Sequence, residues 1–167
     1  MKRLSLTITL LAVIFATRVA AQQSPPAETK ATVDGIEVTI AYSQPALKNR
    51  PFGTSEFHPF GSVWRNGANA ATTLDISDDI TINGEALAKG KYSFYVIPDE
   101  EEWTLIFNSN WDQWGTQYNS STDVLRVKAE SVGSDDPIER YTIKLGDNGE
   151  GSLNWGNFKV VFTVAKS

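Results

Sequence analysis

The sequence has no cysteine and only one histidine, and these two shortages limit the chemistry that the chain can perform. Without cysteine there is no disulfide scaffold, no thiolate nucleophile and no lipid-modified N-terminal cysteine. Zinc sites in proteins draw mainly on His and Cys side chains, so a zinc site is not expected. The sequence predicts neither a metal site nor a bound cofactor.

Basic residues are also few, with 15 Lys and Arg against 20 Asp and Glu. Two of them stand in the opening Met-Lys-Arg, ahead of an apolar run over residues 4–16 and the small residues Val19-Ala20-Ala21. This order is typical of a cleavable secretory signal peptide, so we expect residues 1–21 to be removed. The apolar run is shorter than the roughly 20 residues of a transmembrane helix. We therefore predict a periplasmic or secreted protein.

Removal of residues 1–21 would take away Lys2, Arg3 and Arg18. The remaining chain would carry 12 basic and 20 acidic residues, a net charge of about −8. An acidic surface repels the phosphates of nucleic acids and of anionic lipids. We expect no nucleic-acid partner and no membrane association after cleavage, and the sequence gives no indication of the oligomeric state.

A helical period of 3.6 residues is missing from the rest of the chain, where apolar residues alternate instead. Ile36, Val38, Ile40 and Tyr42 are one such run, and turn signals such as Asn83-Gly84 separate the runs. We predict an antiparallel β-sandwich of about seven to nine strands, with a β-barrel as the alternative. Residues 22–30 are interpreted as a flexible lead-in and residues 31–167 as a single domain.

Two stretches lack the alternation, the first loop (residues 45–69) and the second loop (residues 108–122). The first loop has three prolines and two copies of Pro-Phe-Gly, and the second is rich in Asn, Ser and aromatic residues. Long segments without a strand pattern are uncommon in compact domains and are often functional. The sequence therefore predicts that a functional site, if the domain has one, is formed by these two loops.

Several motifs together resemble the DUF2911 family, whose members are exported bacterial proteins, frequent in Bacteroidetes-type bacteria, with no known function. In chain order they are Phe60-Gly61-Ser62-Val63-Trp64-Arg65-Asn66-Gly67-Ala68-Asn69, Thr72-Thr73, Thr81-Ile82-Asn83-Gly84, Lys89-Gly90-Lys91-Tyr92-Ser93, Trp103-Thr104-Leu105-Ile106-Phe107-Asn108, Gln113-Trp114-Gly115 and Asp123-Val124-Leu125-Arg126-Val127. The resemblance runs from about Ala31 to Val164. It implies an extracytoplasmic β-domain in which the Trp-Arg-x-Gly-Ala-Asn segment is important. Family members usually carry Glu after the last Asn, where this chain has Ala70, so a carboxylate acid or base at that position is missing here.

His58 is the single candidate for a histidine base, and no particular Ser is paired with it by the sequence. It stands in Phe57-His58-Pro59, where packing against aromatic rings is the simpler interpretation. The acidic runs at residues 78–79, 100–102 and 135–136 are interpreted as turns or a solvated hairpin, without a glycosidase-type pair. Residues 147–149 lack the ligand count of an EF-hand and are predicted to form a hairpin turn.

Arg65 and Asn69 are the strongest polar candidates. The guanidinium of Arg65 offers a planar set of donors for a carboxylate, a sulfate or sugar hydroxyls, and Asn69 offers both a donor and an acceptor. The structural alternative is that Arg65 pairs with a buried carboxylate or caps backbone carbonyls while Trp64 fills the core.

The second loop adds aromatic side chains, Trp111, Trp114 and Tyr118, among amide residues. Flat rings beside amides suit carbohydrate binding, because the rings take the apolar C–H surface and the amides take the hydroxyls. Alternatively one or both tryptophans cover the end of the sandwich. We expect Trp114, which precedes Gly115, to be the more buried of the two.

Together these residues predict a binding or scaffold module for a polar ligand, such as a glycan, or for a cell-envelope partner. Ligand contacts would come from Arg65, Asn69, Trp111, Trp114, Tyr118 and His58. A hydrolase of envelope or dietary polymers, using His58 or a carboxylate as base, is the second hypothesis, and the sequence leans against an enzyme. A protein–protein interaction domain without a small ligand is the third.

Overall fold

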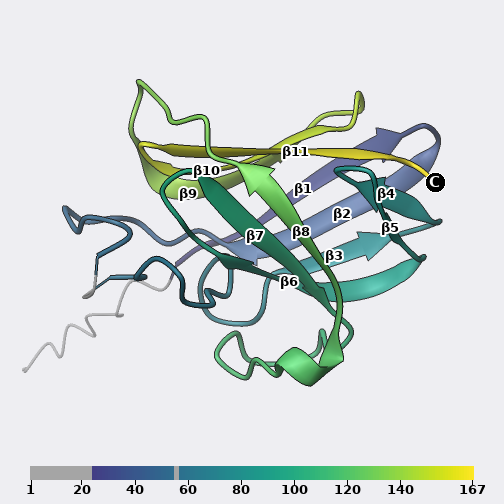
Figure 1. The fold of residues 1–167 in the computed structure, drawn as a ribbon, viewed down its shortest axis with the longest axis horizontal. Helices are drawn as coiled ribbons and strands as arrows, with labels where there is room; N and C mark the ends of the chain where they lie inside the picture. Colours follow the sequence, from purple (N-terminus) through teal and green to yellow (C-terminus); the bar gives the residue numbers. More distant parts are fainter. Residues whose placement is uncertain (1–23, 55–56) are drawn as a thin grey trace, which may run out of the picture.

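The computed structural model describes residues 24–54 and 57–167, and the predicted signal peptide lies outside these residues. Within them the chain forms two antiparallel sheets packed face to face (Figure 1). The all-β sandwich predicted from the alternating pattern is therefore confirmed. In the described part, no helix is long and apolar enough to cross a membrane.

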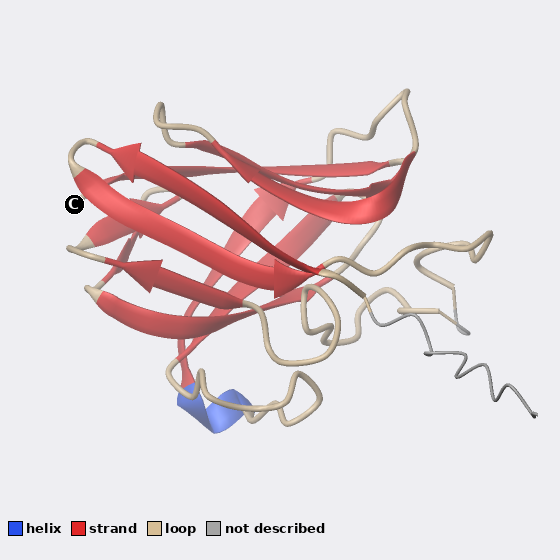
Figure 2. Cartoon of the chain, turned by 180° about the vertical axis from the view of Figure 1, so that it is seen from behind, coloured by secondary structure: helices blue, strands red, loops and turns tan. Residues whose placement is uncertain are grey.

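One sheet has six strands and the other has five, and the chain passes between them three times. The six-stranded sheet has the order β1 (Pro26–Val33), β2 (Ile36–Ser43), β3 (Thr73–Ile76), β6 (Gly90–Ile97), β7 (Glu102–Asn108) and β8 (Asp123–Glu130). The five-stranded sheet has the order β5 (Glu85–Leu87), β4 (Ile80–Ile82), β11 (Phe158–Lys166), β10 (Glu150–Gly156) and β9 (Ile138–Leu145). One short 3₁₀ turn, η1 (Ser120–Thr122), closes the second loop below the six-stranded sheet (Figure 2).

The register of the strands keeps apolar residues on the inner face. In the pairing of β2 with β3, Val38 lies opposite Ile76 and Ile40 lies opposite Leu74, and all four are buried. A shift of one residue would turn each of these side chains outward, so burial fixes the register. The Asn83-Gly84 turn joins β4 to β5, as the sequence predicts, with both residues at positive φ.

Large aromatic rings fill one part of the space between the sheets. The indole of Trp64 stacks on that of Trp155 with ring centroids 5.1 Å apart, and the ring of Phe52 stacks on Trp103 at 5.5 Å. Tyr141 packs edge-on against Trp64 at 4.9 Å. Each such ring buries a large apolar area, and edge-on or offset pairs add further attraction. The first loop is thus anchored in the core through Phe52 and Trp64.

Two details differ from the expectation. The described residues contain eleven strands rather than seven to nine, because strands of three or four residues, such as β3 and β5, are too short to show a period. Residues 26–30 are not a flexible lead-in, because they form the first half of β1 and pair with β2. The inward residues of that half are Ala27 and Thr29, which give no hydrophobic signal, and Pro26 is tolerated because β1 is an edge strand.

Candidate functional site

The Trp64 segment of the first loop pairs with β6 and so places Arg65 on the outer side of the sheet. The backbone of Trp64 donates to and accepts from Val96, at 2.8 and 2.9 Å. Because alternate residues point to opposite faces, the buried Trp64 points into the core and Arg65 points the other way. Tyr95, the neighbour of Val96, also leaves the main core and packs in a small separate cluster with Ile106.

The second loop folds back over this outer face and meets the first loop. The amide of Gly115 donates to the carbonyl of Asn69 at 3.1 Å, and the amide of Ala71 donates to the carbonyl of Gln113 at 3.1 Å. The side chain of Gln113 donates to the Tyr95 hydroxyl at 2.9 Å. A Cβ on Gly115 would lie 2.4 Å from Cδ of Arg65, so this close approach requires glycine. The two loops that lack the strand pattern therefore form one surface.

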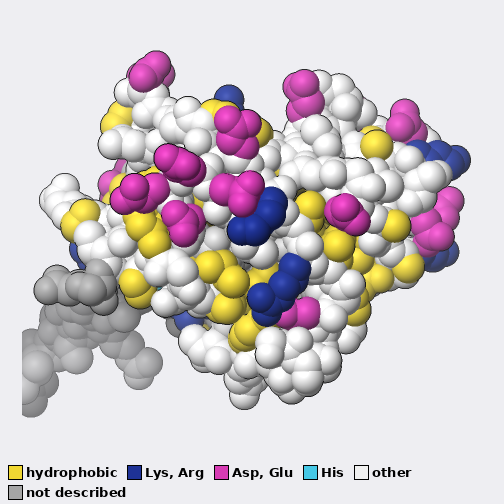
Figure 3. Space-filling view, in the orientation of Figure 1, with side chains coloured by type: hydrophobic (Ala, Val, Ile, Leu, Met, Phe, Trp, Pro, Cys, Tyr) yellow, Lys and Arg dark blue, Asp and Glu magenta, His cyan; other side chains and the backbone are white. Residues whose placement is uncertain are grey.

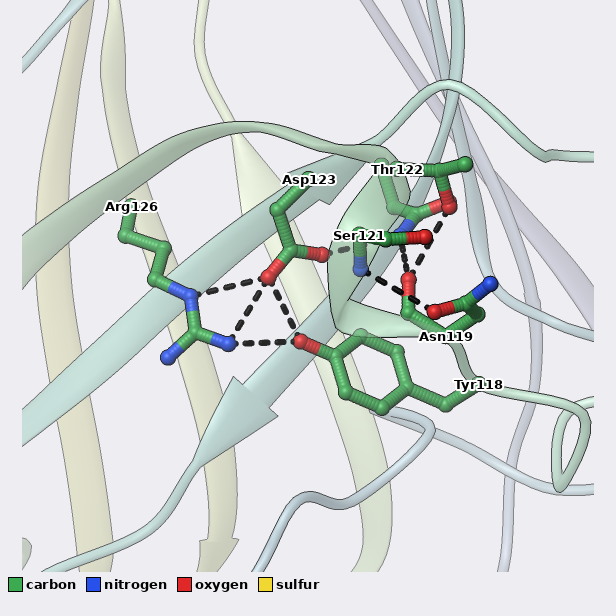
Figure 4. Close-up of polar contacts among 7 residues, drawn as sticks. Tyr118, Asn119, Ser121, Thr122, Asp123 and Arg126 are labelled. Atoms are coloured by element: carbon green, nitrogen blue, oxygen red, sulfur yellow. Dashed lines mark hydrogen bonds and ion pairs between the residues drawn. The ribbon is translucent and has the colours of Figure 1, made fainter.

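Tyr118 is held in the second loop by a charged pair (Figure 4). Its hydroxyl donates to Oδ2 of Asp123 at 2.6 Å and accepts from Nη2 of Arg126 at 2.7 Å, and Arg126 also bonds Asp123. Burial and the hydrogen bond to Asp123 raise the pKa of Tyr118 to about 12, so the phenol is neutral at physiological pH. Its ring packs on Tyr95 with centroids 4.8 Å apart, which leaves Tyr118 as a fixed aromatic wall.

Between the Trp64 segment and the second loop lies a pocket of about 430 Å³. Its described lining combines one cation with aromatic rings and small residues: His58, Val63, Trp64, Arg65, Tyr95, Gly115, Thr116 and Tyr118. Three of the six predicted ligand contacts, His58, Arg65 and Tyr118, are thus brought together.

Arg65 has no ion-pair partner among the described residues, whose four salt bridges all join other side chains. Its Nε is buried and has no hydrogen-bond partner, and the same holds for Nε1 of Trp64. The structural alternative, in which Arg65 pairs with a buried carboxylate, finds no support in the described part of the chain. The charge of this guanidinium is not neutralised by any described residue, so it is suited to an anionic group from outside.

His58 packs among rings, as the simpler interpretation of the sequence has it. Its imidazole lies 4.5 Å from the ring of Phe57 and 5.0 Å from that of Trp64. Burial, together with the positive charges of Arg65 and Arg50, lowers the pKa of His58 to about 4. The imidazole is therefore neutral at physiological pH, and it adds no charge to the pocket.

The other three predicted contacts lie outside the pocket lining. The side chain of Asn69 points toward the β1–β2 hairpin ends, where its Nδ2 donates to the carbonyl of Ser24 and to Oγ of Ser43, both at 3.3 Å. Trp111 lies under Lys91, with Nζ 4.5 Å from the ring centroid. Trp114 is 53% exposed against 40% for Trp111, so the expectation that Trp114 is the more buried was wrong. The glycine beside it makes room for Arg65 rather than for the indole.

Sequence reasoning missed Tyr95, Val63, Thr116 and Gly115 as lining residues. For Tyr95 a signal was present, because the alternation of Tyr92, Phe94 and Val96 places it on the opposite face of β6. Nothing in the sequence showed which part of the second loop would cover that face. Within the described ranges, no group of three or more His, Cys, Asp or Glu residues could hold a metal ion.

The comparison with protein families agrees with the motifs that surround this pocket. The profile of the family described as "Protein of unknown function (DUF2911)" matches residues 24–164, which is most of the chain. The chain belongs to the DUF2911 family. The match includes the whole Trp64–Asn69 segment and the second loop of this DUF2911 chain. No curated protein and no solved structure matches it.

Proposed function

We propose that this DUF2911 chain is a binding module that holds a small polar ligand in the pocket beside Arg65. The observation that supports this proposal is the guanidinium without an ion-pair partner among the described residues, at a pocket walled by Tyr118, with the buried Tyr95 packed behind it. A cation left unpaired beside aromatic walls contributes little to folding stability, whereas it suits ligand binding.

The rigidity of the pocket supports the same proposal. Tyr118 is fixed by Asp123 and Arg126, and Gln113 is fixed on Tyr95. A pocket whose walls are ordered before binding loses less conformational entropy on complex formation.

The hydrolase hypothesis has less support. His58 and Arg65 do lie in one pocket, but its described lining has no carboxylate to act as the second member of an acid and base pair. His58 with a pKa of about 4 is also a weak base at neutral pH.

A thermal-shift screen of the purified protein tests the proposal, with neutral sugars, acidic sugars, amino acids and sulfated sugars as ligands. A ligand at a hundredfold excess over its Kd stabilises the native state by about 2.7 kcal/mol, a shift of several degrees. We expect one ligand class to raise the melting temperature of the wild type and of Arg140→Ala, but not of Arg65→Ala. Arg140 is the matched control, because it carries the same charge on β9 and does not line the pocket. A shift that survives Arg65→Ala, or no shift with any class, would refute the proposal.

A further inference from the structure

We propose that the ligand is an acidic sugar unit, whose single carboxylate binds Arg65 and whose ring lies against Tyr118. This inference rests on the proposed function and assigns a chemical class to its ligand.

The charge of the pocket favours one negative group on the ligand. Of the described lining residues, Arg65 alone is ionised at neutral pH, because His58 is neutral and no Asp, Glu or Lys is among them. The positive charge of Arg65 is felt inside the pocket, since it opposes protonation of His58 and partly offsets the burial that raises the pKa of Tyr95. A monoanion neutralises this site, and its planar carboxylate matches the geometry of the guanidinium.

The charge of the whole protein disfavours ligands with several negative groups. The formal net charge is −5, and acidic side chains gather at the upper left of the face in Figure 3. This negative charge would strongly repel a highly sulfated chain or a nucleotide, whereas it would repel a ligand with one carboxylate much less.

The walls favour a ring with apolar faces rather than a chain of donors and acceptors. The hydroxyl of Tyr118 already bonds Asp123 and Arg126, and that of Tyr95 accepts from Gln113. Tyr95 is buried behind Tyr118, so what the pocket chiefly offers to a ligand here is the apolar surface of the half-buried Tyr118 ring. The C–H faces of a pyranose suit such surfaces.

The size of the pocket agrees with a sugar unit. Its volume of about 430 Å³ is near the small end of the range for small-molecule sites, roughly 300–1,000 Å³. Thr116 and Arg65 line the same pocket and offer it a hydroxyl and a guanidinium. One ring with a carboxylate and hydroxyls provides acceptors for such groups.

Matched sugars test this inference by isothermal titration. The probes are methyl galacturonide and methyl glucuronide, each paired with the neutral methyl galactoside or glucoside that has the same ring. We expect at least one uronide to bind roughly 10- to 100-fold more tightly than its neutral partner, the usual effect of a charge-assisted hydrogen bond. Arg65→Gln should abolish this preference, Arg65→Lys should retain part of it, and Arg140→Gln should leave it unchanged.

The outcomes separate this inference from the proposed function. If neutral and acidic sugars bind equally and Arg65→Gln weakens both to the same extent, the carboxylate assignment is wrong while the pocket still binds a ligand. If benzoate binds and the uronides do not, the charge assignment stands and the sugar assignment is wrong. If no titration probe binds but another class in the thermal-shift screen gives a shift that Arg65→Ala abolishes, the inference fails and the proposed function stands. If no class gives such a shift, both fail. A urea denaturation curve of each variant establishes whether it is folded. If Arg65→Gln is not folded, Arg65→Lys takes its place in the test.

Discussion

Replacement of Asn108 by alanine should both destabilise the protein and loosen the second loop. The side chain of Asn108 is fully buried at the end of β7, where the loop leaves the sheet. Its Nδ2 donates to the carbonyl of Asn119 at 2.9 Å and to Oδ1 of Asp123 at 2.8 Å. Its Oδ1 accepts from the amide of Asn110 at 2.9 Å and from Oγ1 of Thr122 at 3.0 Å. One side chain thus ties together four points of the loop.

The expected cost of Asn108→Ala follows from these four hydrogen bonds. A hydrogen bond contributes about 0.5–1.5 kcal/mol net, and partners left buried without a bond cost more. We expect a loss of about 2–4 kcal/mol in the free energy of unfolding, which for a domain of this size lowers the melting temperature by about 5–15 °C. Urea denaturation followed by tryptophan fluorescence measures it, and an unchanged m-value would indicate the same unfolding transition.

Asn110→Ala is the matched control, because the exposed Asn110 side chain makes a single bond, to Oε1 of Gln113. We expect that control to change the stability by about 0.5 kcal/mol or less. Hydrogen exchange should also become faster in residues 109–122 of Asn108→Ala, and the pocket should lose affinity because Tyr118 is no longer fixed. A loss of less than about 1 kcal/mol, with exchange in the loop unchanged, would refute the role assigned to Asn108.

The remaining predictions concern His58, Gly115 and the N-terminus. The pKa of His58 is about 4 in the folded protein and near 6.5 in the unfolded chain, so the unfolded chain binds the proton more readily. The free energy of unfolding should therefore fall as the pH drops from about 6.5 to about 4. Denaturation curves at pH 7 and pH 5 measure this fall, and the part due to His58 should vanish in His58→Asn. Gly115→Ala should cost about 1–3 kcal/mol and weaken uronide binding, because its Cβ would lie 2.4 Å from Cδ of Arg65; unchanged affinity in titration would contradict this packing. Mass spectrometry of the protein expressed in a bacterium with an export pathway should find an N-terminus at Gln22, and a retained residue 1 would contradict cleavage after Ala21.

The fold could be predicted from the sequence because burial on one face leaves a period of two. That signal was clear in β2, where four inward residues are large and apolar. The signal was absent from the first half of β1, because its inward residues Ala27 and Thr29 are small or polar. Thr29 nevertheless contacts the other sheet, where its Oγ1 donates to the carbonyl of Ile143. Edge strands bury less surface, and their patterns are correspondingly weak.

The candidate site could be predicted only in part. The two loops were located because they lack alternation, and Arg65 stood out because its guanidinium offers a planar set of donors within one of them. The path of the second loop could not be predicted, because it depends on the buried bonds of Asn108 and on the close approach of Gly115 to Arg65. These contacts link residues in segments without a periodic pattern. The sequence therefore did not show that Tyr95, and not Trp111, would line the pocket.

Mapping the ligand contacts by NMR decides whether a uronide occupies the pocket beside Arg65. A ¹⁵N-labelled sample is titrated with the tighter-binding uronide, and the amide and side-chain signals that move are assigned. We expect the signals of residues 63–65, Tyr95 and residues 115–118 to move, together with Nε–H of Arg65. Movement confined to the hollow on the five-stranded sheet, lined by Lys144, Ser152 and Lys159 among others, would contradict ligand binding beside Arg65, as would no movement anywhere.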